Sequence, residues 1–266
     1  MRNVHLRLMV AAILWVPLVG VAQDMASGGA GAGNITGQLN NGMFLNPTAP
    51  GQDLGDLTAQ YCISATPVPG AMAADGSSMG KDYAVGHGGL AVYGITEWLE
   101  VGGQFLIAGR DPDNTAESAG PQVRVQLLQG DDAFADVSVG GVFLFNDVER
   151  QVAFGAVSKN VACPLGEKCP CQAIVVHLGA RQFWQNVKGG ANVDDAVAYG
   201  GIEFLLGDTI SLIGEIQSKA DADSHQPFSV GFQAHHKEGF ACSLAAIQPG
   251  TTDGIGVFAG IGIPFN

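Results

Sequence analysis

The feature of this sequence that most constrains its fold is the alternation of apolar residues at its C-terminal end. Every second position from 255 to 265 is apolar, in the order Ile255, Val257, Ala259, Ile261, Ile263 and Phe265. Alternate side chains of a β-strand lie on the same face. The intervening positions are mostly glycine, so one face is continuously apolar and the other carries few side-chain atoms. A membrane-spanning β-barrel needs such a strand, because one face contacts lipid and the other faces a lumen.

An aromatic residue, Phe265, ends this alternation. The pattern resembles the terminal strand of bacterial outer-membrane barrel proteins, in which a final aromatic residue after alternating apolar ones is an assembly signal. The resemblance implies that the barrel-assembly machinery recognises Phe265. Two positions depart from the family pattern: Phe265 is penultimate rather than last, and Pro264 removes one backbone donor from the strand.

The N-terminus has the composition of a secretory signal. Arg2 and Arg7 supply positive charge, and an apolar run follows from Leu8 to Val21. We expect a signal peptide over 1–22. Beyond it, no apolar stretch approaches the roughly 20 residues that a spanning helix needs.

Three regions are therefore predicted. After the signal peptide, residues 23–54 are expected to be a flexible lead-in and periplasmic N-terminal segment, and residues 55–266 a β-barrel domain. Glycine accounts for 39 of 266 residues, and charged residues for only 14%, against roughly 25% in soluble domains. Without Arg2 and Arg7, ten basic residues face 25 acidic ones, a net charge near −15. Nucleic acid is a poor partner for such a surface.

A second resemblance lies just before the first expected strand. The sequence there is Gly37-Gln-Leu-Asn-Asn-Gly-Met-Phe-Leu-Asn-Pro-Thr-Ala49. It is similar to the Asn/Met-Pro-Thr-Ala element that opens a family of outer-membrane barrels, some of them associated with exopolysaccharide export. The match covers this short element and the general strand spacing, and it carries no catalytic residue.

Alternating segments separated by turn residues predict an all-β fold, a closed antiparallel transmembrane β-barrel of about twelve strands. The expected strands are 55–66, 82–94, 97–109, 121–129, 133–145, 150–159, 173–184, 196–206, 209–217, 227–235, 240–248 and 254–265. Short and long connections should alternate between the two ends of the barrel. Because 144–150 is too short and 160–172 too long for this rule, either a strand is misplaced or the second connection is a periplasmic specialisation.

Polar side chains share one face of these strands, and we assign that face to the lumen. The expected lumen-lining residues are Glu100, Gln104, Arg124, Asp136, His177, Arg181, Tyr199, Glu203, Glu215 and Gln233. A soluble β-sandwich also alternates. Its polar face usually carries charged residues densely, whereas here that face is a sparse mixture of glycines, amides and single charges, which favours the barrel.

The expected lumen has more carboxylates than guanidinium groups. Glu100, Asp136, Glu203 and Glu215 outnumber Arg124 and Arg181, so a conducting barrel should prefer cations. Inward Tyr199, Gln217 and Phe258 would narrow the bore or close it.

Three of the five cysteines form a cluster in the sequence, Cys163, Cys169 and Cys171. An exported protein meets an oxidising compartment, so we expect a disulfide that joins Cys163 to Cys169 or to Cys171. The alternative is a thiolate metal site, but a fourth close ligand is missing. We therefore expect no metal, and the sequence indicates no cofactor.

No nucleophile elbow, zinc-protease helix, phosphate loop or dinucleotide fingerprint occurs in the sequence. We accordingly do not expect an enzyme. Two hypotheses remain for a protein in contact with outer-membrane lipid: a narrow porin-like channel for small solutes with an acidic lumen, or a non-conducting barrel that is structural or serves export of an envelope polymer.

Overall fold

The computed structural model describes residues 43–51, 54–69, 81–109, 115–129, 134–163, 169–187, 193–207, 209–219, 225–235, 240–248, 250 and 254–265. The expected signal peptide over 1–22 and the lead-in as far as residue 42 lie outside the described residues. In the described part of the chain, no helix is long and apolar enough to cross a membrane.

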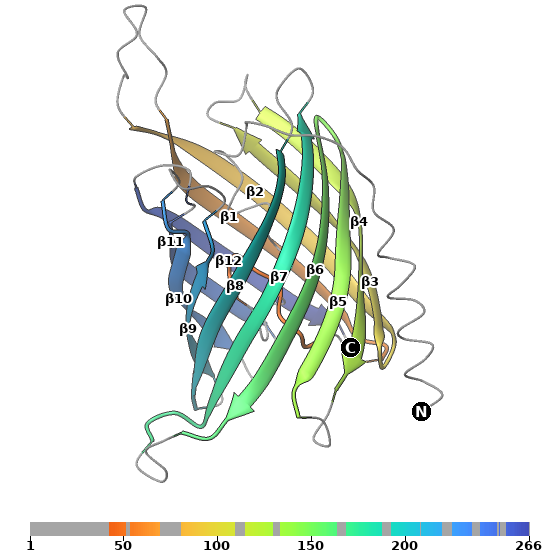
Figure 1. The fold of residues 1–266 in the computed structure, drawn as a ribbon, viewed down its shortest axis with the longest axis vertical. Coiled ribbons are helices and arrows are strands. Elements are labelled where there is room, and N and C mark those ends of the chain that lie inside the picture. The colour runs from red at the N-terminus through yellow and green to blue at the C-terminus, as the bar shows by residue number, and fades with distance from the viewer. Residues whose placement is uncertain are drawn as a thin grey trace, which may run out of the picture.

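Twelve β-strands make up the described fold. They are β1 Leu57–Pro69, β2 Lys81–Thr96, β3 Leu99–Gly109, β4 Thr115–Leu128, β5 Asp136–Asn146, β6 Val148–Val161, β7 Ala173–Val187, β8 Val193–Leu206, β9 Ile210–Gln217, β10 Phe228–His235, β11 Ala241–Gln248 and β12 Gly256–Phe265. Each pairs antiparallel with its neighbours in sequence, and β1 also pairs with β12, so the sheet closes (Figure 1). The predicted closed antiparallel barrel is confirmed. A sandwich would leave sheet edges unpaired, and these twelve strands leave none.

Both ends of the barrel sequence meet at one end of the barrel, which we call the terminal end. Leu57 pairs there with Phe265. The connection from β6 to β7, which contains the cysteines, lies at the same end because the strands are antiparallel. At the opposite end, Asp147 alone separates β5 from β6. The two connections that broke the expected alternation are therefore real, and no strand is misplaced.

The largest error in a strand boundary concerns β4, which begins at Thr115 rather than at residue 121. Residues Thr115–Gly120 pair with Gln104–Gly109 of β3. Small and polar residues dominate this part of β4, so it shows little apolar alternation. Pairing with the more apolar β3 extends the strand where its own sequence does not indicate one.

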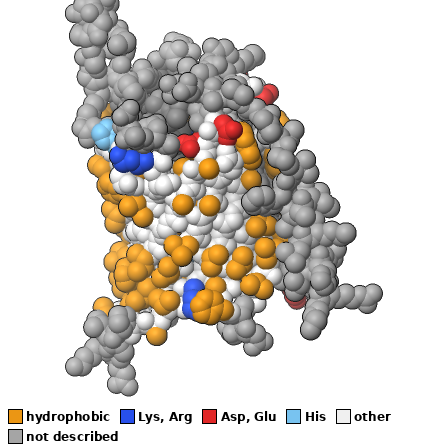
Figure 2. Space-filling view, in the orientation of Figure 1, with side chains coloured by type: hydrophobic (Ala, Val, Ile, Leu, Met, Phe, Trp, Pro, Cys, Tyr) orange, Lys and Arg blue, Asp and Glu red, His pale blue; other side chains and the backbone are white. Residues whose placement is uncertain are grey.

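The outer face of the barrel is apolar all the way round. Each of the twelve strands carries at least one large apolar side chain that is more than a third exposed. Figure 2 shows these side chains across one face of the wall, with charged side chains near its two ends. In β12, Val257 and Ile261 are about half exposed at 53% and 45%, whereas Phe258 between them is buried. The wall therefore has the apolar exterior that a lipid-facing barrel requires.

Candidate functional site

A segment of the chain lies inside the barrel. Residues 43–51, which we call the strap, run through the interior before β1 begins (Figure 1). The side chains of Met43, Phe44 and Leu45 are 2–4% exposed, and those of Asn46, Thr48 and Ala49 are fully buried. This corrects our expectation of a flexible periplasmic segment over 23–54, as far as residues 43–51 are concerned. The physical reason is that a Met-Phe-Leu sequence gains free energy by leaving water when an apolar wall is within reach.

At its N-terminal end, the strap is bound by one carboxylate of β9. The backbone amides of Phe44 and Leu45 each donate a hydrogen bond of 2.7 Å to Glu215 Oε1. The Asn46 side-chain amide donates to Glu215 Oε2 at 3.1 Å, and the Ser229 hydroxyl donates to Oε1. Four donors therefore satisfy a buried carboxylate, as a buried charge requires.

Further along, two strands of the wall bind the strap backbone. Arg181 of β7 donates to the Leu45 carbonyl at 3.0 Å and, through its other terminal nitrogen, to Gln217 Oε1 at 2.6 Å. The Ala49 amide donates to the Ser158 hydroxyl of β6 at 3.1 Å. The strap is thus held along its length by hydrogen bonds to its backbone.

The far end of the strap reaches β4. Arg124 donates to the Pro50 carbonyl, and the same guanidinium lies 3.8 Å from the Glu100 carboxylate of β3. β4 and β9 lie five strands apart in a barrel of twelve, almost on opposite sides. The strap consequently crosses the lumen from one side of the barrel to nearly the opposite side.

The apolar side chains of the strap pack against residues of β1, β2, β8, β9, β11 and β12. One buried cluster joins Met43, Phe44 and Leu45 of the strap to Cys62, Leu90, Val92, Tyr199, Ile213, Ala245, Ile247 and Phe258. The rings of Phe44 and Phe258 lie 5.8 Å apart between centroids, within the range of favourable aromatic pairs. Gly201 leaves room for Met43, because a Cβ there would lie 2.2 Å from the Met43 sulfur.

The polar groups of the lumen are distributed unevenly. Among the described residues, every buried charged or histidine side chain lies on β3 to β9: Glu100, Arg124, His177, Arg181, Glu203 and Glu215. The inward positions of β10, β11, β12, β1 and β2 carry Gly, Ala, Ser, Thr, Gln and apolar side chains among those described. We call β3–β9 the charged wall and β10–β2 the uncharged wall.

Nine of the ten residues predicted to line the lumen are buried on the inward face: Glu100, Gln104, Arg124, His177, Arg181, Tyr199, Glu203, Glu215 and Gln233. Asp136 is half-buried. Tyr199 belongs to the apolar cluster and donates from its hydroxyl to the Gly155 carbonyl at 3.3 Å.

Sequence reasoning missed several other inward residues, among them Ser158, Ser229 and Arg150. Arg150 donates to the Gln185 side chain at 2.9 Å and 2.7 Å through two of its nitrogens. The strand parity that found His177 would also have found Ser158, because Ser158 pairs directly with it. Phe265, the predicted assembly signal, points outward and is 51% exposed.

Ser158, His177 and Glu203 together resemble a nucleophile, a base and an acid. The Ser158 hydroxyl lies 2.8 Å from His177 Nδ1, and His177 Nε2 lies 3.4 Å from Glu203 Oε2. All three side chains are at most 2% exposed, and Ser158 already accepts the hydrogen bond from Ala49. In this structure the strap covers the serine, and Ser158 is bound to it through the Ala49 amide.

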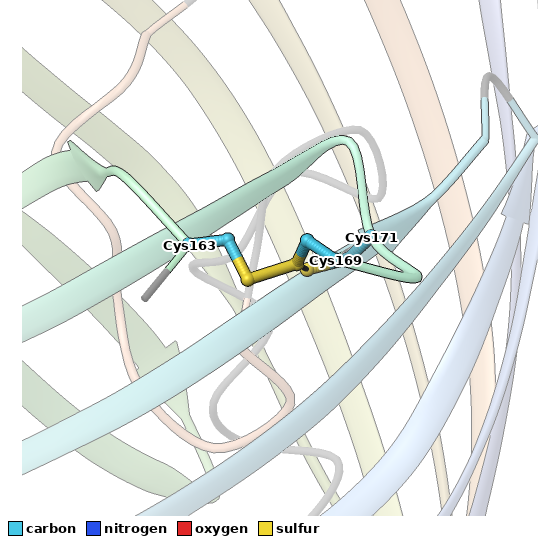
Figure 3. A group of neighbouring side chains, drawn as sticks. All are labelled: Cys163, Cys169 and Cys171. Carbon is cyan, nitrogen blue, oxygen red and sulfur yellow. Dashed lines mark hydrogen bonds between the residues drawn. A yellow bond between two sulfur atoms is a disulfide. The ribbon is translucent and has the colours of Figure 1, made fainter. Parts of the chain in front are cut away.

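At the terminal end, Cys163 and Cys169 form a disulfide, one of the two pairings that the sequence left open (Figure 3). Cys171 is a buried free thiol. The three sulfur atoms lie within 4.8 Å of one another, so if all three were reduced they would also offer three ligands to a soft metal ion.

No protein-family model matches the sequence, and no curated protein matches it significantly. Among solved structures, the barrel is similar to a KdgM porin, with a TM-score of 0.52 and 9% identity over 79% of this chain and 99% of that one. It is also similar to the COG4313 outer membrane channel from Pseudomonas putida F1, with a TM-score of 0.53 and 12% identity over 82% of this chain and 98% of that one. The fold is therefore that of bacterial outer-membrane porins and channels.

Proposed function

We propose that this protein is a narrow, porin-like channel for small solutes in the bacterial outer membrane, and that the strap sets its bore. The observation that carries this proposal is a closed barrel with an apolar exterior whose polar interior is crossed by residues 43–51. Lipid is then the partner of the outer face. The assembly machinery is the partner of the outward Phe265, in line with the resemblance of the last strand.

The strap makes the channel narrower than its strand number alone implies. A twelve-strand barrel leaves limited interior space. Here part of that space is filled by the apolar side chains of the strap, which pack into a cluster shared by both walls, and by its backbone, which is bound to the charged wall. Solutes must pass through the remaining lumen or wait for the strap to move, so a low conductance is expected.

Lumen charge supports a cation preference that is weaker than a count of carboxylates suggests. Glu100 faces Arg124, Glu203 faces His177, and Glu215 is satisfied by the strap. Arg150, on the same inward face, adds a positive charge. Paired charges create a smaller field than free ones, so selectivity should be modest and should weaken as salt rises.

The test is reversal potential and single-channel conductance of the refolded protein in a planar bilayer under a KCl gradient. Small, cation-preferring openings are expected, and the double variant Glu203→Gln with Glu215→Gln should reduce the preference. Glu149→Gln, an exposed change on β6, is the matched control and should leave the preference unchanged. Anion preference, or no response to the double variant, contradicts the role of the two carboxylates.

A non-conducting barrel that serves envelope-polymer export is the second candidate, and the strap is the observation that favours it. A lumen that stays closed in the wild type and also after removal of the strap would support this candidate over a channel.

The absence of enzymatic activity is part of the proposal. The interior trio that resembles catalytic residues is covered by the strap. An ester-hydrolysing activity that is lost in Ser158→Ala would contradict it.

A further inference from the structure

The cysteine-containing connection at the terminal end holds three sulfur atoms in an arrangement that a simple structural disulfide does not need. Cys163 and Cys169 are bonded, and the Cys171 sulfur lies 2.8 Å from that of Cys169 (Figure 3). Pro170, between Cys169 and Cys171, does not keep their sulfurs apart. A third sulfur is therefore already in contact with one atom of the bond.

We propose that these residues form a thiol–disulfide exchange site whose ligand is a small-molecule disulfide. The Cys171 thiol loses its proton to solvent, and the thiolate attacks the Cys169 sulfur. A Cys169–Cys171 bond forms, the Cys163–Cys169 bond breaks, and the electron pair leaves on the Cys163 sulfur, which takes up a proton. The step is an isomerisation, so it needs no oxidant or reductant.

The exchange changes which thiol is accessible. Cys171 is 9% exposed, whereas Cys163 is half-buried. The exchange therefore moves the free thiol from a covered position to a more accessible one. The Cys163 thiolate then attacks an external disulfide, forming a mixed disulfide and releasing one equivalent of thiol. An exported protein meets such disulfides in an oxidising compartment.

The other two free cysteines of the described residues make this site distinct. Cys62 is buried on the inward face of β1, and Cys242 is exposed on the outward face of β11. Both lie within strands and outside the sulfur cluster. A double variant, Cys62→Ser with Cys242→Ser, removes them and leaves the reactive cluster unchanged.

The test is a peptide map of this double variant in detergent micelles, trapped with an alkylating agent before and after incubation with oxidised glutathione. Trypsin cleaves after Lys159, Lys168 and Arg181, which separates Cys163 from Cys169 and Cys171. The Cys163–Cys169 isomer appears as two linked peptides. The Cys169–Cys171 isomer appears as two separate peptides, with the alkyl label or glutathione on Cys163.

Both isomers are expected before incubation, with glutathione on Cys163 afterwards. Cys171→Ser should keep the linked peptides and lose the glutathione adduct, and heat-modifiable mobility shows whether this variant folds. The proposal would be overturned if only the linked peptides appeared and both the alkyl label and glutathione were confined to Cys171. The Cys163–Cys169 disulfide alone would account for that result. Stoichiometric zinc with three alkylatable thiols would overturn the proposal equally.

Discussion

The charged wall and the uncharged wall of the lumen bind the same strap by different means. The charged wall provides the side chains that hydrogen-bond to its backbone, among them Glu215, Arg181 and Arg124. The uncharged wall provides the surface on which Phe44 packs, chiefly Phe258. One short segment thus satisfies buried charges on one side and buries apolar area on the other. The difference shows that the strap supplies hydrogen-bond partners and apolar contacts that the interior of the barrel would otherwise lack.

Substitutions on the two walls should destabilise the strap for different physical reasons. Buried charges are stabilising only while their partners remain, and removing one partner of a buried charged network commonly costs about 3–5 kcal/mol. Apolar contacts weaken in proportion to the area and volume lost. Water that enters the lumen would reduce the cost of losing a charged partner and the cost of losing an apolar contact. The first reduction should be larger, because water replaces hydrogen bonds but not apolar contacts.

The largest effect among single substitutions is expected for Glu215→Ala on the charged wall. Three hydrogen bonds to the strap disappear together, those of Phe44, Leu45 and Asn46. Each orphaned group costs roughly 1–3 kcal/mol when it stays dry. The strap should detach at this end, which should raise the mean single-channel conductance and the current noise. Glu149→Ala is the control. Equal conductance in the wild type, Glu215→Ala and Glu149→Ala would show that Glu215 does not hold the strap.

Phe44→Ala tests the uncharged wall and should have the next largest effect. It removes the ring that faces Phe258 at 5.8 Å and leaves the hydrogen bonds to Glu215 possible. A buried Phe→Ala change costs about 3–5 kcal/mol in a dry core, and a hydrated lumen should lower that figure. We expect a lower unfolding midpoint in detergent with a smaller rise in conductance than for Glu215→Ala. Phe232→Ala, on the lipid-facing side and 41% exposed, is the matched control.

A conductance rise in Phe44→Ala that exceeds the rise in Glu215→Ala would reverse the comparison. It would mean that apolar packing, and not the carboxylate, decides the position of the strap.

The smallest effect is expected for Gly201→Ala. The added Cβ would meet the Met43 sulfur at 2.2 Å, but that sulfur is near the flexible end of its side chain and can move. The unfolding midpoint should fall slightly, with conductance unchanged. Gly214→Ala is a close control, because a Cβ at Gly214 has no heavy atom within 4 Å. A larger fall in unfolding midpoint for Gly214→Ala than for Gly201→Ala would show that Met43 does not pack against Gly201.

The sequence predicted the wall of this barrel well, because strand parity is a local property. Val257 and Phe258 show their opposite faces in the sequence itself, and the structure places them on opposite faces. The parity rule likewise places Glu203 and Glu215 inside. The expected strand boundary is furthest from the structure where local alternation is weak, as at Thr115–Gly120, where pairing with β3 decides.

The strap could not be predicted in the same way. Met43–Ala49 has no period of two, and its location depends on contacts with residues more than 100 positions away, such as Ser158 and Glu215. A resemblance in this element was visible, but a resemblance does not say where a segment lies. The balance of charge in the lumen is limited in the same way: the sequence supplies the number of carboxylates, but their partners, such as Arg124 beside Glu100, are set by the tertiary structure.

The central claim is that residues 43–51 obstruct the lumen, and the most direct measurement is single-channel conductance of a variant that lacks residues 43–50, compared with the parent protein in the same bilayer. Heat-modifiable mobility establishes that both barrels are folded. The account predicts a clearly larger conductance for the shortened protein, with weaker ion selectivity, because the strap no longer narrows the path. Equal conductance in two folded barrels would contradict the claim and show that the strap does not restrict the path through the lumen.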